Sequence, residues 1–163
     1  MTIDLNDFDI GQVITKDLIS LSLKSMNKKD VINELTDLLV KHGDVENKQK
    51  FVDDVLAREK EGMTGLGKGV AIPHGKSIAV KNTTISIGIS KNDIQWESLD
   101  DKPVNVIILF AVKDTDANTL HIKLLQKVAI LLANEDFIKN LHTVQTKDEL
   151  IDLFINTSKE LEK

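Results

Sequence analysis

Residues 104–112 read VNVIILFAV, and this stretch decides the fold because nearly every position in it is apolar. A strand that is covered on one face alternates apolar and polar residues, whereas a strand covered on both faces is apolar throughout. We therefore expect a buried strand here, inside a sheet with helices on both sides. A second strand is expected at residues 84–90 (TISIGIS), and a polar connection that contains Trp96 joins the two.

Helical patterns occur before and after these strands. The first follows Asn27, whose side chain suits a helix N-cap, and stops at Gly43, a typical C-cap. Further helices are expected at residues 47–60, from residue 119 or 120, after residue 134, and after Thr146, which opens a T-x-x-E capping box. Apolar and polar residues alternate loosely over residues 10–23 and indicate one or two short strands.

This order of elements predicts an α/β fold, a three-layer α/β/α sandwich with a mixed β-sheet flanked by helices. The 163 residues have a mass of 18.2 kDa, which suits one domain over residues 1–163. No internal repeat and no linker-like stretch divides the sequence.

Composition excludes several classes of function. The chain has no cysteine, which removes disulfides and thiolate chemistry, and no histidine pair has zinc-ligand spacing, so neither metal nor cofactor is expected. The net charge of −5 and the lack of a basic stripe argue against nucleic acid. No apolar run approaches the roughly 18 residues of a membrane span, and the N-terminus is acidic, so we expect a cytoplasmic protein without direct membrane insertion.

Four histidines are candidates for chemistry. His74 lies between Pro73 and Gly75, where we expect a loop at a strand's end that presents the imidazole to a bulky group. A neutral imidazole is nucleophilic near pH 7, although a turn histidine without function is an equal alternative from the residues alone. His42 and His142 end helices, where they complement the helix dipole and need no function.

Two further residues suit a phosphoryl group. His121 falls in the first turn of its predicted helix, where a neutral imidazole can donate to an anion, although position alone favours an ordinary surface histidine. Arg58 is the only arginine, and its planar guanidinium matches phosphoryl oxygens. The ordinary explanation for Arg58 is an ion pair on the helix surface with Glu61 or Asp54.

Residues 62–69 read GMTGLGKG, with half of the chain's eight glycines, and indicate irregular backbone. The stretch matches neither a P-loop nor a dinucleotide-binding motif. It suits a shaped loop beside His74, in which the Thr64 hydroxyl and backbone amides are donors.

The run from Arg58 to Gly75, R-E-x5-G-L-G-x-G-V-A-I-P-H-G, resembles the signature of the fructose/mannitol-type IIA domains of the bacterial phosphoenolpyruvate:sugar phosphotransferase system, and so does Leu120-His121-Ile122. The resemblance extends over nearly the whole chain. It implies that His74 accepts a phosphoryl group from the phosphocarrier protein HPr and passes it to a IIB component of a sugar permease. His121 and Arg58 would stabilise the phosphate. The phosphate loop expected beside them comprises Thr64, Gly65, Gly67 and Gly75.

The resemblance therefore implies a phosphotransferase for sugar uptake, of the fructose, mannitol or galactitol type. We expect Met63, Leu66 and Ile78 to form an apolar docking surface for the two protein partners. A regulatory nitrogen-type IIA protein, whose phosphorylation state controls partner binding, shares the same motif and remains the main alternative. A histidine domain without phosphoryl chemistry is the third.

Overall fold

The computed structural model describes residues 10–116 and 120–161. Six strands form its sheet: β1 (Ile19–Ser20), β2 (Gly65–Gly67), β3 (Val70–Ala71), β4 (His74–Ser77), β5 (Thr84–Ile94) and β6 (Val104–Lys113). The strand order is β1-β5-β6-β3-β2, with β4 also paired to β6. β5 and β6 are antiparallel, whereas β1 runs parallel to β5, and β3 and β4 run parallel to β6. The predicted mixed sheet is confirmed.

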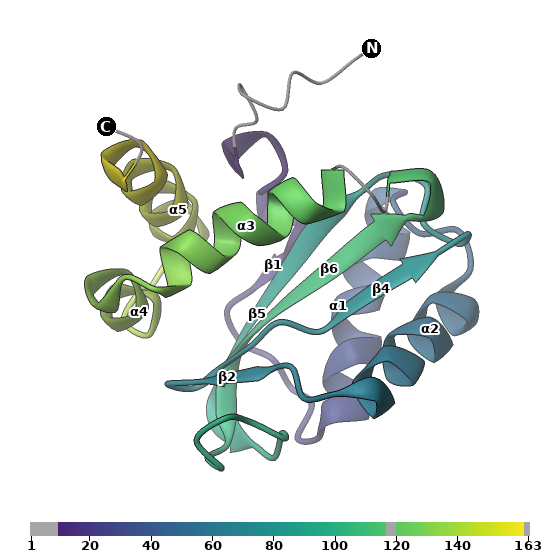
Figure 1. Cartoon of the computed structure of the whole chain (residues 1–163), viewed down its shortest axis with the longest axis horizontal. Helices are drawn as coiled ribbons and strands as arrows, with labels where there is room; N and C mark the ends of the chain where they lie inside the picture. Colours follow the sequence, from purple (N-terminus) through teal and green to yellow (C-terminus); the bar gives the residue numbers. More distant parts are fainter. Residues whose placement is uncertain (1–9, 117–119, 162–163) are drawn as a thin grey trace.

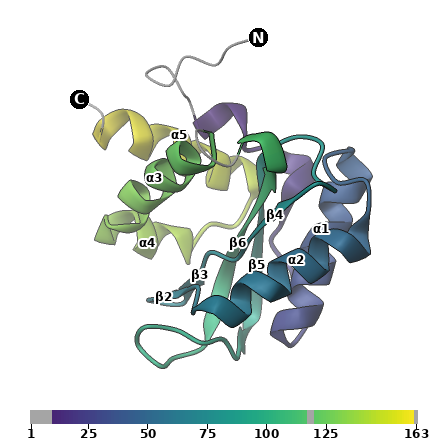
Figure 2. The same ribbon diagram turned by 45° about the vertical axis from the view of Figure 1, so that its right-hand side comes forward.

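Helices cover both faces of this sheet (Figures 1 and 2). They are α1 (Lys28–His42), α2 (Lys48–Glu61), α3 (Leu120–Leu132), α4 (Glu135–Leu141) and α5 (Lys147–Leu161), with short 3₁₀ helices η1 (Ile10–Gln12), η2 (Lys16–Leu18) and η3 (Asp114–Asp116). Figure 2 shows α1 and α2 on one side and α3, α4 and α5 on the other, which is the predicted three-layer arrangement.

The apolar run that forms β6 supplies both halves of the core. Val106, Ile108 and Phe110 pack in the cluster that includes side chains of α3, α4 and α5. Ile107 and Leu109 alternate with them and pack in the cluster that includes α1 and α2. Successive side chains of a strand point to opposite faces, so an uninterrupted apolar strand holds the two helical layers together.

The helix ends agree with their sequence signals. The Asn27 side chain accepts a hydrogen bond from the Asp30 amide at 2.9 Å and starts α1, and Gly43 ends that helix in the left-handed conformation. At α5, Thr146 Oγ1 accepts from the Glu149 amide at 3.1 Å. α3 begins at Leu120, one of the two predicted positions, while residue 119 lies outside the described part of the chain.

Of two predictions about strands, the first is confirmed by a single short strand and the second is wrong. Residues 10–23 contain the 3₁₀ helices η1 and η2 and only a two-residue strand, because β1 pairs with β5 over Ile19 and Ser20 alone. His74 was expected on a loop after a strand, but it is the first residue of β4 and lies opposite Phe110 of β6 in a parallel register. Pro73 lacks an amide hydrogen and precedes β4, where no donor is needed from it.

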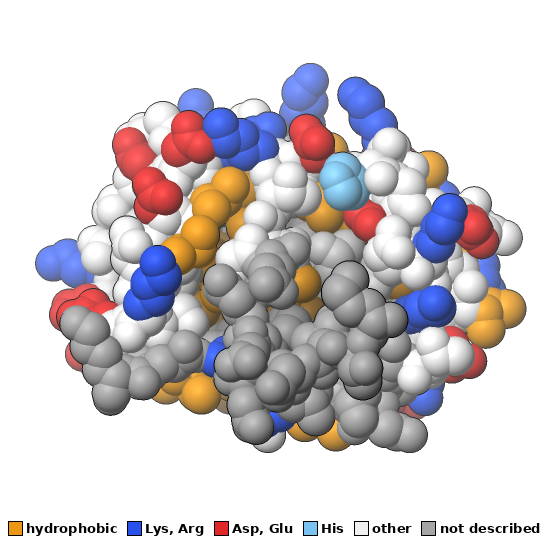
Figure 3. Space-filling model, turned by 90° about the horizontal axis from the view of Figure 1, so that it is seen from above, with side chains coloured by type: hydrophobic (Ala, Val, Ile, Leu, Met, Phe, Trp, Pro, Cys, Tyr) orange, Lys and Arg blue, Asp and Glu red, His pale blue; other side chains and the backbone are white. Residues whose placement is uncertain are grey.

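Charged side chains of both signs are interspersed over the face shown in Figure 3, with no concentration of basic groups among the described residues there. Within residues 10–116 and 120–161, none of the helices combines the length and the apolar character that crossing a membrane requires.

Candidate functional site

An open cavity of about 450 Å³ lies between α2, the edge strand β4 and the first turn of α3. It brings together three residues that are far apart in the sequence, Arg58, His74 and His121. The other lining residues are Asp54, Ala57, Glu61 and Lys76. All three side chains predicted to act on a phosphoryl group therefore face one site.

The imidazole of His74 is oriented by its own backbone segment. Its Nδ1 lies 3.3 Å from the Ile72 carbonyl oxygen, which only accepts hydrogen bonds, so Nδ1 carries the proton in the neutral ring. The lone pair of that tautomer is then on Nε2. The His121 ring lies beside it, with the two ring centroids 5.4 Å apart and the rings tilted by 49°.

The environment lowers the pKa of His74 below its ordinary value of 6.5. Burial is the main cause because it disfavours the imidazolium, and the positive charge of Arg58 acts in the same direction. The hydrogen bond to the Ile72 carbonyl and the charges of Glu59 and Glu61 oppose the shift. A neutral imidazole is the form that attacks phosphorus, so the site favours the reactive state.

This balance predicts the titration of His74. We expect its ring to titrate below pH 6.5, Arg58→Gln to raise the midpoint and Glu61→Gln to lower it further, measured by NMR of the imidazole carbon-bound protons. Because the folded state has the lower pKa, the unfolded chain takes up the proton first. His74 therefore reduces the stability of the fold as the pH falls through 6.5 towards the folded pKa. Shifts of equal sign in both variants would contradict this assignment of charges.

Arg58 is half-buried in the last turn of α2, and its Nη1 donates to the Gly62 carbonyl at 3.3 Å. Among the described residues it forms no ion pair within 4.0 Å, although Asp54 and Glu61 line the same cavity. The ordinary surface ion pair considered from sequence is therefore absent. The guanidinium retains donors that can bind an anion in the cavity.

The glycine-rich segment does not form the expected phosphate loop. It is instead a hairpin of β2 and β3, whose turn contains Gly69 with φ of 78°. The Gly65 amide donates to the Glu97 carbonyl at 3.1 Å and the Gly67 amide to Ser98 Oγ at 3.0 Å. Both amides are thus engaged by the loop after β5 and are not directed at an anion.

Thr64 and Gly75 also have different roles from those predicted. The Thr64 hydroxyl is buried and donates to Glu59 Oε1 at 2.5 Å, so it has no proton left for a phosphate. Gly75 lies in β4 against α2, where an added Cβ would come within 2.6 Å of a Val55 methyl group. Its missing side chain allows the helix to pack closely on the strand.

Sequence reasoning missed Lys76 as part of the site. Residues two apart on a strand share a face, so Lys76 points to the same side of β4 as His74. The alternation would have shown this if residues 74–77 had been predicted as a strand. Asp54 and Glu61 lie four before and three after Arg58, which places them on its face of α2.

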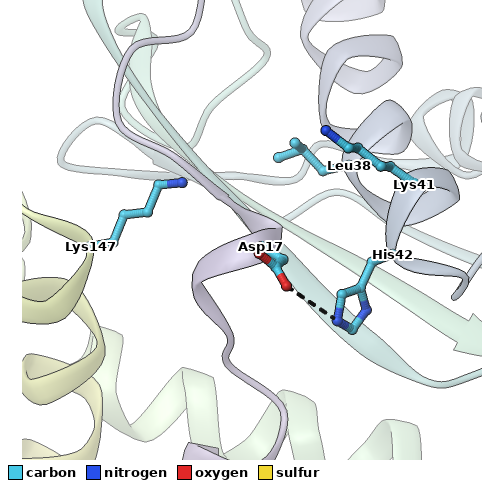
Figure 4. Close-up of a pocket in the computed structure, with 5 residues that line it drawn as sticks. All are labelled: Asp17, Leu38, Lys41, His42 and Lys147. Carbon is cyan, nitrogen blue, oxygen red and sulfur yellow. Dashed lines mark ion pairs between the residues drawn. The ribbon is translucent and has the colours of Figure 1, made fainter.

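A second cavity, of about 340 Å³, lies away from this site, between η2, the end of α1 and the start of α5 (Figure 4). His42 lines it, with Nδ1 at 2.7 Å from Asp44 and Nε2 at 3.9 Å from Asp17. His42 therefore has two acidic neighbours as well as its place at the helix end. His142 ends α4 and lies 2.7 Å from the Lys68 carbonyl.

Comparison with known proteins supplies the class to which this fold and site belong. Residues 12–157 match the family described as "Phosphoenolpyruvate-dependent sugar phosphotransferase system, EIIA 2". The chain therefore belongs to this family of IIA components of the phosphotransferase system.

Relatives of two kinds are found. The chain is 35% identical to the fructose-specific EIIABC component of Bacillus subtilis over 144 residues, which are 88% of this chain but 22% of that protein. It is 31% identical to the fructose-specific EIIA component of Haloferax volcanii, covering 89% of this chain and 94% of that one. The crystal structure of the nitrogen regulatory protein IIA-Ntr from Neisseria meningitidis matches with a TM-score of 0.81 and 30% identity, over 89% and 98% of the two chains.

A further solved structure shows a IIA protein with its partner. It is the complex of enzyme IIA and phosphorylated enzyme IIB for mannitol from Escherichia coli, with a TM-score of 0.74 and 25% identity. The match covers 88% of this chain and 97% of that one.

Proposed function

We propose that His74 accepts a phosphoryl group from HPr and passes it to a IIB component of a sugar permease. The observation that carries the proposal is the meeting of His74, Arg58 and His121 at one open cavity. Membership of the IIA family supports the direction of transfer, and so does the mannitol IIA–IIB complex of a relative.

In this relay, His74 Nε2 attacks phosphorus as the phosphorus–nitrogen bond of phosphorylated HPr breaks, and the nitrogen of HPr regains its lone pair. The three equatorial oxygens carry the charge of the transferring group, so the protein mainly positions and stabilises it. Arg58 and Lys76 supply positive charge, and His121 supplies a ring donor. A nucleophile of IIB then attacks phosphorus while the phosphorus–nitrogen bond to His74 breaks, and Nε2 regains its lone pair in the neutral ring.

The experiment follows the phosphoryl group through the relay. The chain is incubated with phosphoenolpyruvate, enzyme I and HPr, purified as the phosphoprotein, and then mixed with a IIB component while intact masses are recorded. Loss of phosphate from this chain with gain on IIB supports a role in sugar uptake. Acceptance from HPr without transfer to any fructose-, mannitol- or galactitol-type IIB would contradict the second half of the relay.

A regulatory role is the second candidate, because the IIA-Ntr structure from Neisseria meningitidis resembles this fold with a TM-score of 0.81. In that role the phosphorylation state of His74 controls the binding of a protein partner rather than sugar uptake. Binding to such a partner that differs between the phosphorylated and unphosphorylated chain, with no transfer to IIB, would favour it.

Exposed apolar side chains close in sequence to the site residues suit transient protein partners. Met63, Leu66 and Ile78 are all exposed, and Ile122 next to His121 is exposed as well. Both partners must reach the same imidazole, so we propose that this surface docks each of them in turn.

A charge in this surface is expected to weaken docking. Leu66→Asp should raise the KM for phosphorylated HPr about tenfold, because a desolvated carboxylate replaces an apolar contact, while the thermal stability stays close to that of the wild type. Leu161→Asp on α5 is the matched control, since Leu161 is 40% exposed and Leu66 38%. Equal KM values for the two variants would contradict the proposed docking surface.

A further inference from the structure

A buried carboxylate ties the end of α2 to three other segments. The Glu59 side chain is only 5% exposed and accepts hydrogen bonds from Thr64 Oγ1 at 2.5 Å and from Lys28 Nζ at 2.9 Å. Thr64 is 3% exposed and accepts a hydrogen bond from Trp96 Nε1 at 2.9 Å. Lys28 also pairs with Glu97 and lies 5.0 Å from the centre of the Trp96 ring.

This arrangement compensates the charge that it buries. Burial lowers the pKa of Lys28, but hydrogen bonds to Glu97 and Glu59 outweigh that effect and raise it, so the ammonium stays charged beside the carboxylate. A charged acceptor also makes the Thr64 hydrogen bond stronger than a neutral pair. The bond between Glu59 and Thr64 is therefore a firm link rather than a loose surface contact.

The Thr64–Glu59 hydrogen bond lies next to the backbone of Arg58 and to the acceptor of its side chain. Arg58 precedes Glu59 in the last turn of α2, where the carbonyls lack partners within the helix and the backbone tends to fray. Its guanidinium donates to the carbonyl of Gly62, which lies between Glu59 and Thr64 in the chain. The Thr64–Glu59 bond thus closes the short segment 59–64, which contains the Gly62 acceptor and begins at the residue next to Arg58.

We infer that Thr64 and Glu59 are positioning residues, which hold the Arg58 guanidinium over the phosphoryl group that His74 accepts. The inference rests on the proposed function of His74. Neither side chain lines the cavity, so their positioning role is exerted through Arg58, although the charge of Glu59 also acts on His74 directly. An active group misplaced by about 1 Å can slow a reaction by two orders of magnitude, which is why such a support matters.

The test removes the Thr64 hydroxyl with little change of shape. Thr64→Val is expected to lower kcat for acceptance from phosphorylated HPr by about ten- to a hundredfold, with the KM for HPr unchanged. Thr64→Ser retains a hydroxyl that can donate to Glu59, so we expect kcat within about threefold of the wild-type value. Serine and valine variants that are equally slow would overturn the inference.

A second background separates positioning from a general effect on the fold. When Arg58 is already replaced by Gln, adding Thr64→Val is expected to change kcat less than twofold, because two residues that act through one group are not additive. A loss of the same size in both backgrounds would overturn the inference. Thr64→Val leaves the buried Trp96 indole without its acceptor, so the comparison is repeated with Trp96→Phe in every chain if that variant fails to fold.

Titration of His74 decides the question without any phosphoryl donor. The positive charge of Arg58 lowers the pKa of His74, so displacement of the guanidinium by Thr64→Val is expected to raise it in the direction of Arg58→Gln. If the wild type accepts no phosphoryl group, the proposed function fails, but this NMR shift still reports the position of Arg58. A His74 pKa that rises in Arg58→Gln and is unchanged in Thr64→Val would overturn the inference.

Discussion

His74→Gln is expected to abolish acid-labile phosphorylation by phosphoenolpyruvate, enzyme I and HPr while the fold is retained. The glutamine amide has no nitrogen lone pair with imidazole reactivity, so the attack on phosphorus has no nucleophile. Its NH₂ group can still donate to the Ile72 carbonyl, which His74 Nδ1 contacts at 3.3 Å. Intact mass spectrometry before and after mild acid treatment measures the loss of labelling, and circular dichroism checks the fold.

The matched control is His142→Gln. His142 also contacts a backbone carbonyl, that of Lys68 at 2.7 Å, but it is exposed at the end of α4 and does not line the cavity. We expect this variant to be labelled as fast as the wild type. If His74→Gln were labelled at the wild-type level, or if its phosphate were found on His121, a different nitrogen would be the acceptor of the phosphoryl group.

The sequence predicted those features of the fold that depend on local pattern. The apolar run of β6 indicated a strand buried on both faces, and its alternating side chains do fill both halves of the core. Asn27 and Gly43 marked the ends of α1 because capping depends on residues within one turn. The short strand predicted within residues 10–23 is present as β1, but the 3₁₀ helices beside it were not predicted, because a loose alternation of apolar residues also suits 3₁₀ turns that pack on a core.

The site was predictable only in part, for a physical reason. Arg58, His74 and His121 were found through a motif, and the fold brings them to one cavity. The partners of the glycine-rich hairpin were not predictable, because the hydrogen bonds that Trp96 donates to Thr64 and that Gly65 donates to Glu97 join segments about 32 residues apart. Such pairs depend on how β2 lies against the loop after β5, which spacing alone does not specify.

Gly75→Ala is expected to destabilise the fold by about 1–3 kcal/mol, the usual cost of overpacking a core. An added Cβ would lie 2.6 Å from a Val55 methyl group and 3.0 Å from the Phe51 ring, and both side chains are fully buried. Typical domains are stable by only 5–15 kcal/mol, so the change is a sizeable fraction of the total. Urea unfolding measures the difference.

Gly62→Ala is the matched control, since its added Cβ would have only Arg58 Nη1 nearby, at 3.9 Å. Adding Val55→Ala to Gly75→Ala should destabilise the chain by less than the sum of the two single changes, because one truncation makes room for the other methyl group. This double variant distinguishes packing from phosphate binding. If Gly75→Ala instead kept full stability but lost phosphoryl acceptance, Gly75 would belong to a phosphate-binding strand. If Gly75 serves packing alone, the activity of Gly75→Ala falls only to the extent that the fold is destabilised, because β4 contains both Gly75 and His74.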